Sequence, residues 1–203
     1  MNLKERFINL CKRYNNDEKR IEELWQEIYL SFNSAKRYYH TFEHLKDLYS
    51  NLDNFLESSY EFAIFYHDTI YDVFRDDNEE RSALLAKKHL ESLNVPLSTI
   101  DEIETFILES KTHTPSSSKS ALFLDADIAI LGSKREKYIT YVQNIQKEYS
   151  YLSKESFLHG RKKVIRHFLE RKQIYNTSYF FQKFEKQART NLTFELKELE
   201  NLI

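Results

Sequence analysis

The sequence has very little glycine, proline or cysteine, and it contains no long apolar run. Its 203 residues include 2 glycines and 2 prolines, so the turn residues that hairpins and sheets need are nearly missing. The single cysteine, Cys11, excludes an internal disulfide. No segment approaches the roughly 20 apolar residues of a membrane span. These shortages leave an all-helical globular protein as the expected class.

The chain also has no excess of charge of one sign: it contains 30 basic and 32 acidic residues, and its net charge is −2. No global field would therefore attract nucleic acid or an anionic membrane. The 14 tyrosines and 15 phenylalanines could stack on bases, but without a broad basic surface we expect no nucleic-acid polymer as partner. The N-terminal stretch MNLKERFINLCKRYNN lacks the apolar core of a signal peptide, and we expect a cytoplasmic protein.

Apolar residues recur at helical spacing along nearly the whole chain. The spacing predicts helices over residues 3–14, 17–33, 41–57, 59–74, 77–93, 98–112, 120–132, 134–150, 153–173 and 177–202. The residue types at four helix starts suit caps, namely a capping box over Ser98–Asp101 and single caps at Asp77, Ser153 and Thr177, and Gly132 suits a helix end. No linker, internal repeat or sustained heptad is visible. We expect one domain, residues 1–203, folded as an irregular helical bundle.

The stretch FYHDTIYD places a His-Asp pair, His67 and Asp68, among residues suited to burial. Burying an unpaired carboxylate would cost several kcal/mol or force it to take up a proton. A metal ion would remove that penalty. If residues 59–74 form one helix, Asp72 lies on the same face as Asp68, one turn further along.

Two more segments put metal-binding side chains among apolar residues. In RYYHTFEHL, His40 and His44 are four residues apart and would share one face of a helix. In ALFLDADIAILG, Asp125 and Asp127 interrupt an apolar run, and on a helix they point in opposed directions, so one would bind a metal while the other caps or orients.

Each of these features also has an ordinary structural interpretation. A buried histidine is usually a hydrogen-bonded core residue, and Asp125 could be a helix cap. Taken together, three such segments offer imidazole and carboxylate groups without a thiolate, which is the ligand set of a hydrolytic or redox metal site.

The order and spacing of these residues resemble the HD superfamily of metal-dependent phosphohydrolases. His44 precedes His67 by 23 positions, and Asp127 follows His67 by 60. The chain is similar to a bacterial branch of predicted HD phosphohydrolases, through the segments YHTFEHL, FYHDTIYD, DNEERSA, FLDADIAILG, FLHGR and IYNTSYF. Together these segments lie within roughly residues 20–200, nearly the whole chain.

The resemblance implies a divalent metal ion, such as Mn, Mg, Fe, Zn, Ni or Co. The implied ligands are His44, His67, Asp68 and one aspartate of the DAD segment, with Asp127 preferred and Asp125 left as the alternative. Some members carry two acidic residues at the third and fourth positions after the His-Asp pair. This chain has Tyr71 and Asp72 there, which leaves Asp72 as the expected general base or water-orienting group.

These residues predict an enzyme that hydrolyses a nucleotide or another small phosphoester. Four further residues are candidates for substrate binding: His40, Arg37, Arg161 and His113. Two other functions use the same ligands. A di-iron oxygenase would add His40 and Asp125 to the ligand set, and a non-catalytic helical module would bind a metal or small ligand without turnover.

Overall fold

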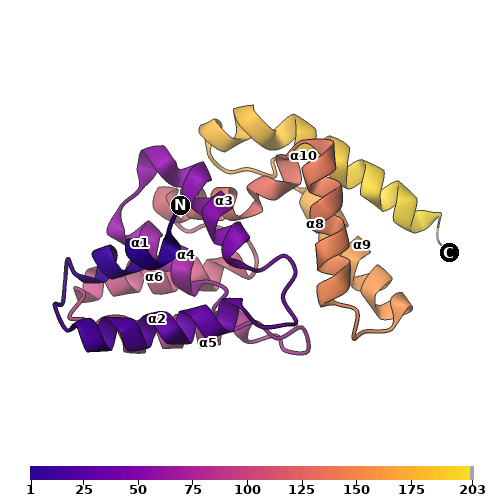
Figure 1. Cartoon of the computed structure of the whole chain (residues 1–203). Coiled ribbons are helices and arrows are strands. Elements are labelled where there is room, and N and C mark those ends of the chain that lie inside the picture. The colour runs from indigo at the N-terminus through magenta and orange to yellow at the C-terminus, as the bar shows by residue number, and fades with distance from the viewer. Residues whose placement is uncertain (202–203) are drawn as a thin grey trace. The chain divides into compact units, whose positions relative to one another are not determined.

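The computed structural model describes residues 1–201, and every regular element in that range is a helix (Figure 1). The all-helical class expected from the sequence is therefore confirmed. Contacts divide the chain into two compact units, Met1–Leu124 and the part that begins at Asp125. The single domain expected from the sequence stays a prediction. Within residues 1–201, no helix combines the length and the apolar character that crossing a bilayer requires.

The first unit contains six α-helices, a short 3-10 turn and most of a seventh helix. Their bounds are α1 Leu3–Cys11, α2 Glu18–Phe32, α3 Phe42–Leu52, η1 Asp53–Phe55, α4 Ser58–Tyr66, α5 Asn78–Ser92, α6 Leu97–Ser110 and α7 Ser118–Asp127.

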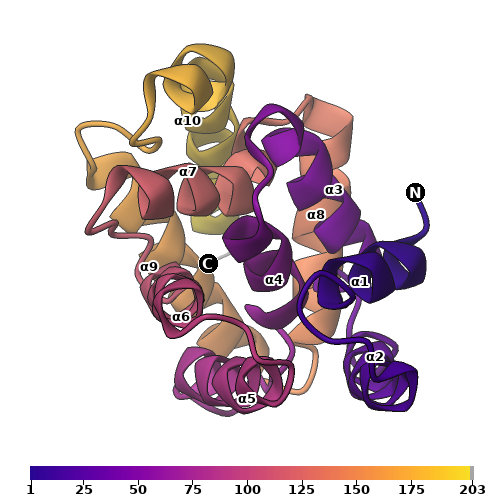
Figure 2. The ribbon, with the colours of Figure 1, turned by 90° about the vertical axis from the view of Figure 1, so that its left-hand side faces the viewer.

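The helix α4 is the centre of this unit, because every residue from Ser59 to Tyr66 is buried. It contacts α1, α3, α5 and α6, which surround it in Figure 2. A helix that is apolar on all sides must be covered on all sides, and this arrangement meets that requirement. The end of α4 therefore brings the next residues of the chain, His67 and Asp68, into the interior of the unit.

Aromatic rings fill much of the space around α4. Phe65 meets Phe7 edge-on at a centroid distance of 5.1 Å, and on another side Phe106 stacks on Phe123 at 5.6 Å. Buried aromatic rings carry much of the packing energy of a small domain, and truncating one to alanine typically costs about 3–5 kcal/mol. The aromatic rings packed around α4 therefore form a tightly packed core next to His67 and Asp68.

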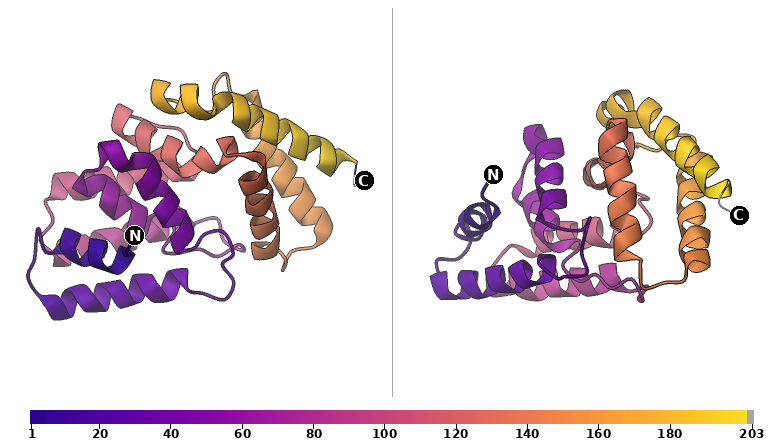
Figure 3. Two further views of the ribbon diagram at one scale, coloured as in Figure 1. Left: turned by 45° about the horizontal axis from the view of Figure 1, so that its top comes forward. Right: turned by 45° about the vertical axis from the view of Figure 1, so that its right-hand side comes forward.

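The second unit contains the end of α7, the 3-10 turn η2 Ile128–Gly132, and the helices α8 Arg135–Glu148, α9 Lys154–Glu170 and α10 Ser178–Glu200. The helix α10 packs against α9 and η2, as Figure 3 shows. A Cβ atom added at Gly132 would lie 2.5 Å from the Cβ atom of Phe184 on α10. Glycine is needed there because α10 passes so close to the backbone.

Side chains cap several of these helices as the sequence predicts. Ser153 and Thr177 accept hydrogen bonds from the first-turn N–H groups of α9 and α10, so both predicted caps are confirmed. The predicted capping box at Ser98 is wrong, since α6 begins at Leu97 without a side-chain cap. Asp77 precedes α5 without capping it, because its carboxylate binds Arg75 at 2.6 Å instead.

The largest difference from the predicted helices lies at residues 59–74, where α4 ends at Tyr66. The chain then turns, with the Thr69 N–H donating to the Tyr66 carbonyl. The predicted helices over 41–57 and 120–132 are also divided, each into an α-helix followed by a 3-10 turn.

Candidate metal centre

His44 lies in the first turn of α3 and is buried. Thr41 caps this helix, and its hydroxyl accepts a hydrogen bond from the Glu43 N–H. The backbone of Thr41 is extended, so His40 lies outside the helix and the predicted pairing of His40 with His44 along one helical face is wrong. Their rings nevertheless lie 5.9 Å apart between centroids, because the extended segment folds back beside the first turn.

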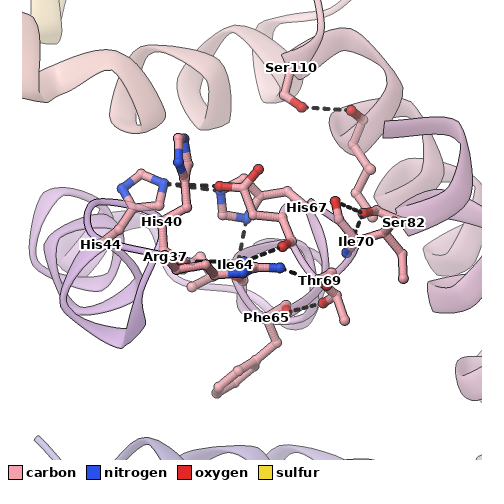
Figure 4. Close-up of polar contacts among 12 residues, drawn as sticks. Arg37, His40, His44, Ile64, Phe65, His67, Thr69, Ile70, Ser82 and Ser110 are labelled. Atoms are coloured by element: carbon pink, nitrogen blue, oxygen red, sulfur yellow. Dashed lines mark hydrogen bonds and ion pairs between the residues drawn. The ribbon is translucent and has the colours of Figure 1, made fainter. Parts of the chain in front are cut away.

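His67 is the capping residue that follows the last residue of α4, and its ring is fixed by a backbone contact (Figure 4). Its Nδ1 atom lies 3.1 Å from the Ile64 carbonyl oxygen. A carbonyl can only accept, so Nδ1 carries the proton and Nε2 is left with a lone pair. This is the state in which histidine binds a metal.

Three potential ligand atoms meet at this point. The Nε2 atom of His67 lies 3.1 Å from Nε2 of His44 and 3.1 Å from Oδ2 of Asp68, and the remaining pair, His44 Nε2 and Asp68 Oδ2, is 3.6 Å apart. Within residues 1–201 this is the one group of three or more such side chains whose ligand atoms all lie within 4.8 Å of one another. Two imidazoles and a carboxylate suit a divalent transition metal, so the residues present fit the predicted ion.

Electrostatics at the cluster favour an ionised carboxylate. Burial by itself opposes the charge on Asp68, but the neighbouring imidazoles in their protonated form, His67 first, hold the pKa of Asp68 well below its usual range. The carboxylate is therefore a negatively charged ligand at neutral pH.

Other side chains hold the turn that carries Asp68. The Thr69 hydroxyl donates to the Phe65 carbonyl at 2.8 Å, and Ser82 on α5 accepts from the Ile70 N–H at 3.0 Å. The Arg37 guanidinium reaches the same turn, where it donates to the Asp68 and Thr69 carbonyls (Figure 4). These bonds account for the burial of Arg37 without a phosphate, and the predicted contact with substrate stays a prediction.

Asp72 does not occupy the helical position that the sequence analysis gave it. Because α4 ends at Tyr66, Asp72 lies in a loop with an exposed side chain, and its Oδ1 atom accepts from the Phe74 N–H at 3.0 Å. The spacing argument for Asp72 beside Asp68 is therefore wrong, while its role as a general base stays a prediction.

Glu79 is a carboxylate that the sequence analysis did not select. It lies in the first turn of α5 and is half-buried. Burial raises the pKa of Glu79, and the negative charge of Asp68 raises it further. A half-buried carboxylate with a raised pKa beside a metal cluster is a candidate for proton transfer. From the sequence, Glu79 is expected in the first turn of a helix, where a carboxylate favours the helix dipole, and a role near the active site is only secondary.

His113, the remaining candidate of the first unit, opens the serine-rich loop after α6. Its backbone has φ = 51°, in the left-handed region, and its N–H donates to the Glu109 carbonyl at 2.8 Å. The side chain is half-buried. Its predicted contact with substrate stays a prediction.

The two aspartates of the DAD segment have different surroundings in the second unit. Asp125 is completely buried and accepts four hydrogen bonds, two from Asn176 and two from Thr177, at 2.7 to 3.0 Å. Burial raises the pKa of Asp125, and these four bonds oppose that rise. Asp127 is the last residue of α7 and is half-buried. The oxygens of Asp125 thus anchor the start of α10, and the predicted roles of Asp125 and Asp127 as metal ligands stay predictions.

Arg161, predicted to contact phosphate, is buried in α9 within a complete network. Its guanidinium donates to both oxygens of Glu195 at 2.7 and 2.9 Å and to the Tyr141 hydroxyl at 3.0 Å. The Tyr138 hydroxyl donates to the same carboxylate. The network ties α8, α9 and α10 together, and it accounts for the charge of Arg161 without a substrate.

Of the predicted metal ligands, His44, His67 and Asp68 meet in the first unit, whereas Asp127 belongs to the second unit and stays a predicted ligand. The resemblance to the HD superfamily depends on the motifs of the chain and on this cluster. No protein-family model, no curated protein and no solved structure matches the chain.

Proposed function

We propose that the protein is a metal-dependent phosphohydrolase of the HD type, acting on a nucleotide or another small phosphoester. The observation that carries the proposal is the meeting of the buried His44 and His67 with the half-buried Asp68, whose ligand atoms lie within 4.8 Å of one another. His44 lies at the start of α3, and His67 and Asp68 follow the end of α4, the next α-helix of the chain. Burying them together is costly unless a cation is shared between them.

Four residues would hold the ion, namely His44, His67, Asp68 and Asp127. A divalent ion bound there would lower the pKa of a water molecule and offset negative charge on a phosphoryl oxygen. The Nδ1–H of His67 donates to the Ile64 carbonyl, so Nε2 would be the atom that binds the ion.

A proton must leave the attacking water, and two carboxylates are candidates to accept it. Glu79 is the stronger, because it is half-buried and responds to the charge of Asp68. Asp72 is the alternative taken from the sequence, although its exposed carboxylate already accepts from the Phe74 N–H. His40 lies at the same site, with its ring centroid 4.2 Å from that of Tyr71, and could receive a phosphoryl oxygen when protonated.

Elemental analysis of untagged protein, followed by assay of the same sample against nucleotides and generic phosphoesters, tests the proposal. We expect stoichiometric metal and release of phosphate. Asp68→Asn should lose both metal and turnover, while Asp53→Asn, at an exposed aspartate of η1, should keep both. Full activity in Asp68→Asn would refute the site.

The same sample separates the competing functions. Iron with visible colour and oxygen uptake would indicate oxygen chemistry. Stoichiometric metal with tight binding of a phosphoester and no turnover would indicate a binding module.

A further inference from the structure

We propose that Arg37 is a positioning residue of the metal centre, which sets metal affinity by joining the backbone before α3 to the turn after α4. This inference rests on the proposed function, since it concerns the same ion. It assigns to Arg37 a role through the main chain in place of a contact with substrate.

The guanidinium of Arg37 donates to three carbonyl oxygens. Its Nη1 atom lies 3.2 Å from the His40 carbonyl and 2.6 Å from that of Asp68, while Nη2 lies 2.9 Å from the Thr69 carbonyl. The side chain is 9% exposed. The Phe32 and Tyr71 rings lie 4.7 and 5.4 Å from its central carbon, so aromatic faces also hold the cation.

These three carbonyls belong to the two segments that deliver the ligands. His40 immediately precedes the cap and first turn of α3, from which His44 projects. Asp68 is itself a candidate ligand, and Thr69 follows it. The guanidinium therefore links the two segments through their backbones, beside the point where their side chains meet.

The end of α4 explains why side-chain donors are needed there. Asp68 and Thr69 lie beyond the last residue of α4, where the regular hydrogen bonds of the helix have ended. After Tyr66 the chain turns, so the Asp68 and Thr69 carbonyls need donors from elsewhere. Arg37 supplies both from a loop 31 and 32 residues away.

Arginine suits this position better than lysine does. The planar guanidinium group of arginine reaches three acceptors at fixed angles and packs flat against aromatic rings. The ammonium group of lysine, on a flexible aliphatic chain, does neither. Loss of such a supporting contact commonly weakens metal binding by about 10-fold to 100-fold. We expect that range for Arg37→Ala, and a partial loss for Arg37→Lys.

Arg189 in the second unit provides a matched control. Its guanidinium also donates to three backbone carbonyls, those of Leu169, Arg171 and Lys172. Arg189→Ala should therefore lower thermal stability through the same kind of contact while leaving Co²⁺ affinity within a small factor of wild type.

The experiment is titration of the metal-free proteins with Co²⁺, read by the visible absorption of the bound ion, together with thermal unfolding of each variant. Guanidinium chloride, far below denaturing concentrations, should restore part of the Co²⁺ affinity of Arg37→Ala by filling the space the side chain leaves, and sodium chloride should not. A folded Arg37→Ala protein with wild-type Co²⁺ affinity would overturn the proposal. So would equal losses of affinity in Arg37→Ala and Arg189→Ala.

A metal-free readout separates this inference from the proposed function. In ¹H–¹³C spectra of the apoproteins, the imidazole signals of His44 and His67 should move in Arg37→Ala and stay in place in Arg189→Ala. If wild type binds no ion, the proposed function fails, and these spectra alone decide whether Arg37 positions the two rings. Unchanged imidazole signals would then count against it.

Discussion

The Nε2 atoms of His44 and His67 lie 3.1 Å apart, although 23 residues separate them in sequence. His67 has its Nδ1 proton committed to the Ile64 carbonyl, so its Nε2 lone pair points toward His44. Two imidazole nitrogens this close need a proton or a cation between them, and the Asp68 carboxylate beside them supplies the matching negative charge. This arrangement underlies the first prediction.

Divalent ions should stabilise the wild-type protein, because they bind the folded state and not the unfolded one. The gain follows mass action and reaches about 2.7 kcal/mol when the free ion is about 100 times its Kd. Asp68→Asn removes the charged ligand and should abolish most of that gain, while Asp53→Asn should retain it. Thermal unfolding with and without Mn²⁺, Co²⁺ or Zn²⁺ measures the effect. Equal stabilisation of wild type and Asp68→Asn would count against the cluster as a metal site.

Substitutions in the DAD segment should separate its two aspartates. Asp125→Asn replaces an acceptor with an amide that faces the donors of Asn176 and Thr177, so we expect a loss of about 2–4 kcal/mol in the free energy of unfolding. Asp127→Asn should change stability less and should weaken metal binding by about 10-fold or more. Urea unfolding of the apoproteins and metal titration of the folded variants give the two readouts. The reverse pattern would make Asp125 the ligand.

The helical class was predictable from the sequence because it depends on local properties. Few glycines and prolines and a helical spacing of apolar residues leave little alternative. The end of α4 was not predictable in the same way, since Ile70 and Val73 continue the helical spacing beyond Tyr66. Donors and acceptors distant in sequence, from Arg37 and Ser82, stabilise the turn instead.

In the candidate site, too, local features were predictable from the sequence, and contacts between residues distant in sequence were not. The residue types and order of His44, His67 and Asp68 were visible in the sequence, and the structure brings these three together. The surroundings of Arg161 were not visible, because it lies in a basic run typical of an exposed helix face. Its partner Glu195 is 34 residues away, and only the packing of α9 against α10 buries the pair.

The Arg161–Glu195 pair should act on stability and not on substrate binding. Arg161→Met leaves the Glu195 carboxylate buried without its cation, so we expect a loss of about 3–5 kcal/mol. Replacing both residues with methionine should recover much of this loss, because no unpaired charge remains.

The exposed pair Arg166–Glu200 offers a control, since Arg166→Met should cost less than about 1 kcal/mol. Urea unfolding measures all three variants. A raised KM for a phosphoester in a folded Arg161 variant of normal stability would restore its predicted contact with phosphate.

His89 should make the protein less stable in acid. Its ring is 1% exposed, with Nδ1 lying 3.2 Å from the Tyr66 hydroxyl and Nε2 lying 3.3 Å from a Glu27 carboxylate oxygen. In the neutral ring the hydroxyl donates to Nδ1, and Nε2–H donates to Glu27. Burial lowers the pKa of His89 below its ordinary 6.5, and the charge of Glu27 opposes this shift.

A histidine with a lowered pKa binds its proton more weakly in the folded state than in the unfolded one. The neutral ring therefore contributes stability that is fully present above pH 6.5 and is lost as the pH falls through the lower, folded-state pKa. His89→Gln cannot titrate, so its free energy of unfolding should fall less steeply over that window, after an initial loss of about 1 kcal/mol from the altered hydrogen bonds. Urea unfolding of wild type, His89→Gln and the exposed control His159→Gln across this pH range measures the difference. Parallel curves for wild type and His89→Gln would show that the buried ring does not govern the acid response.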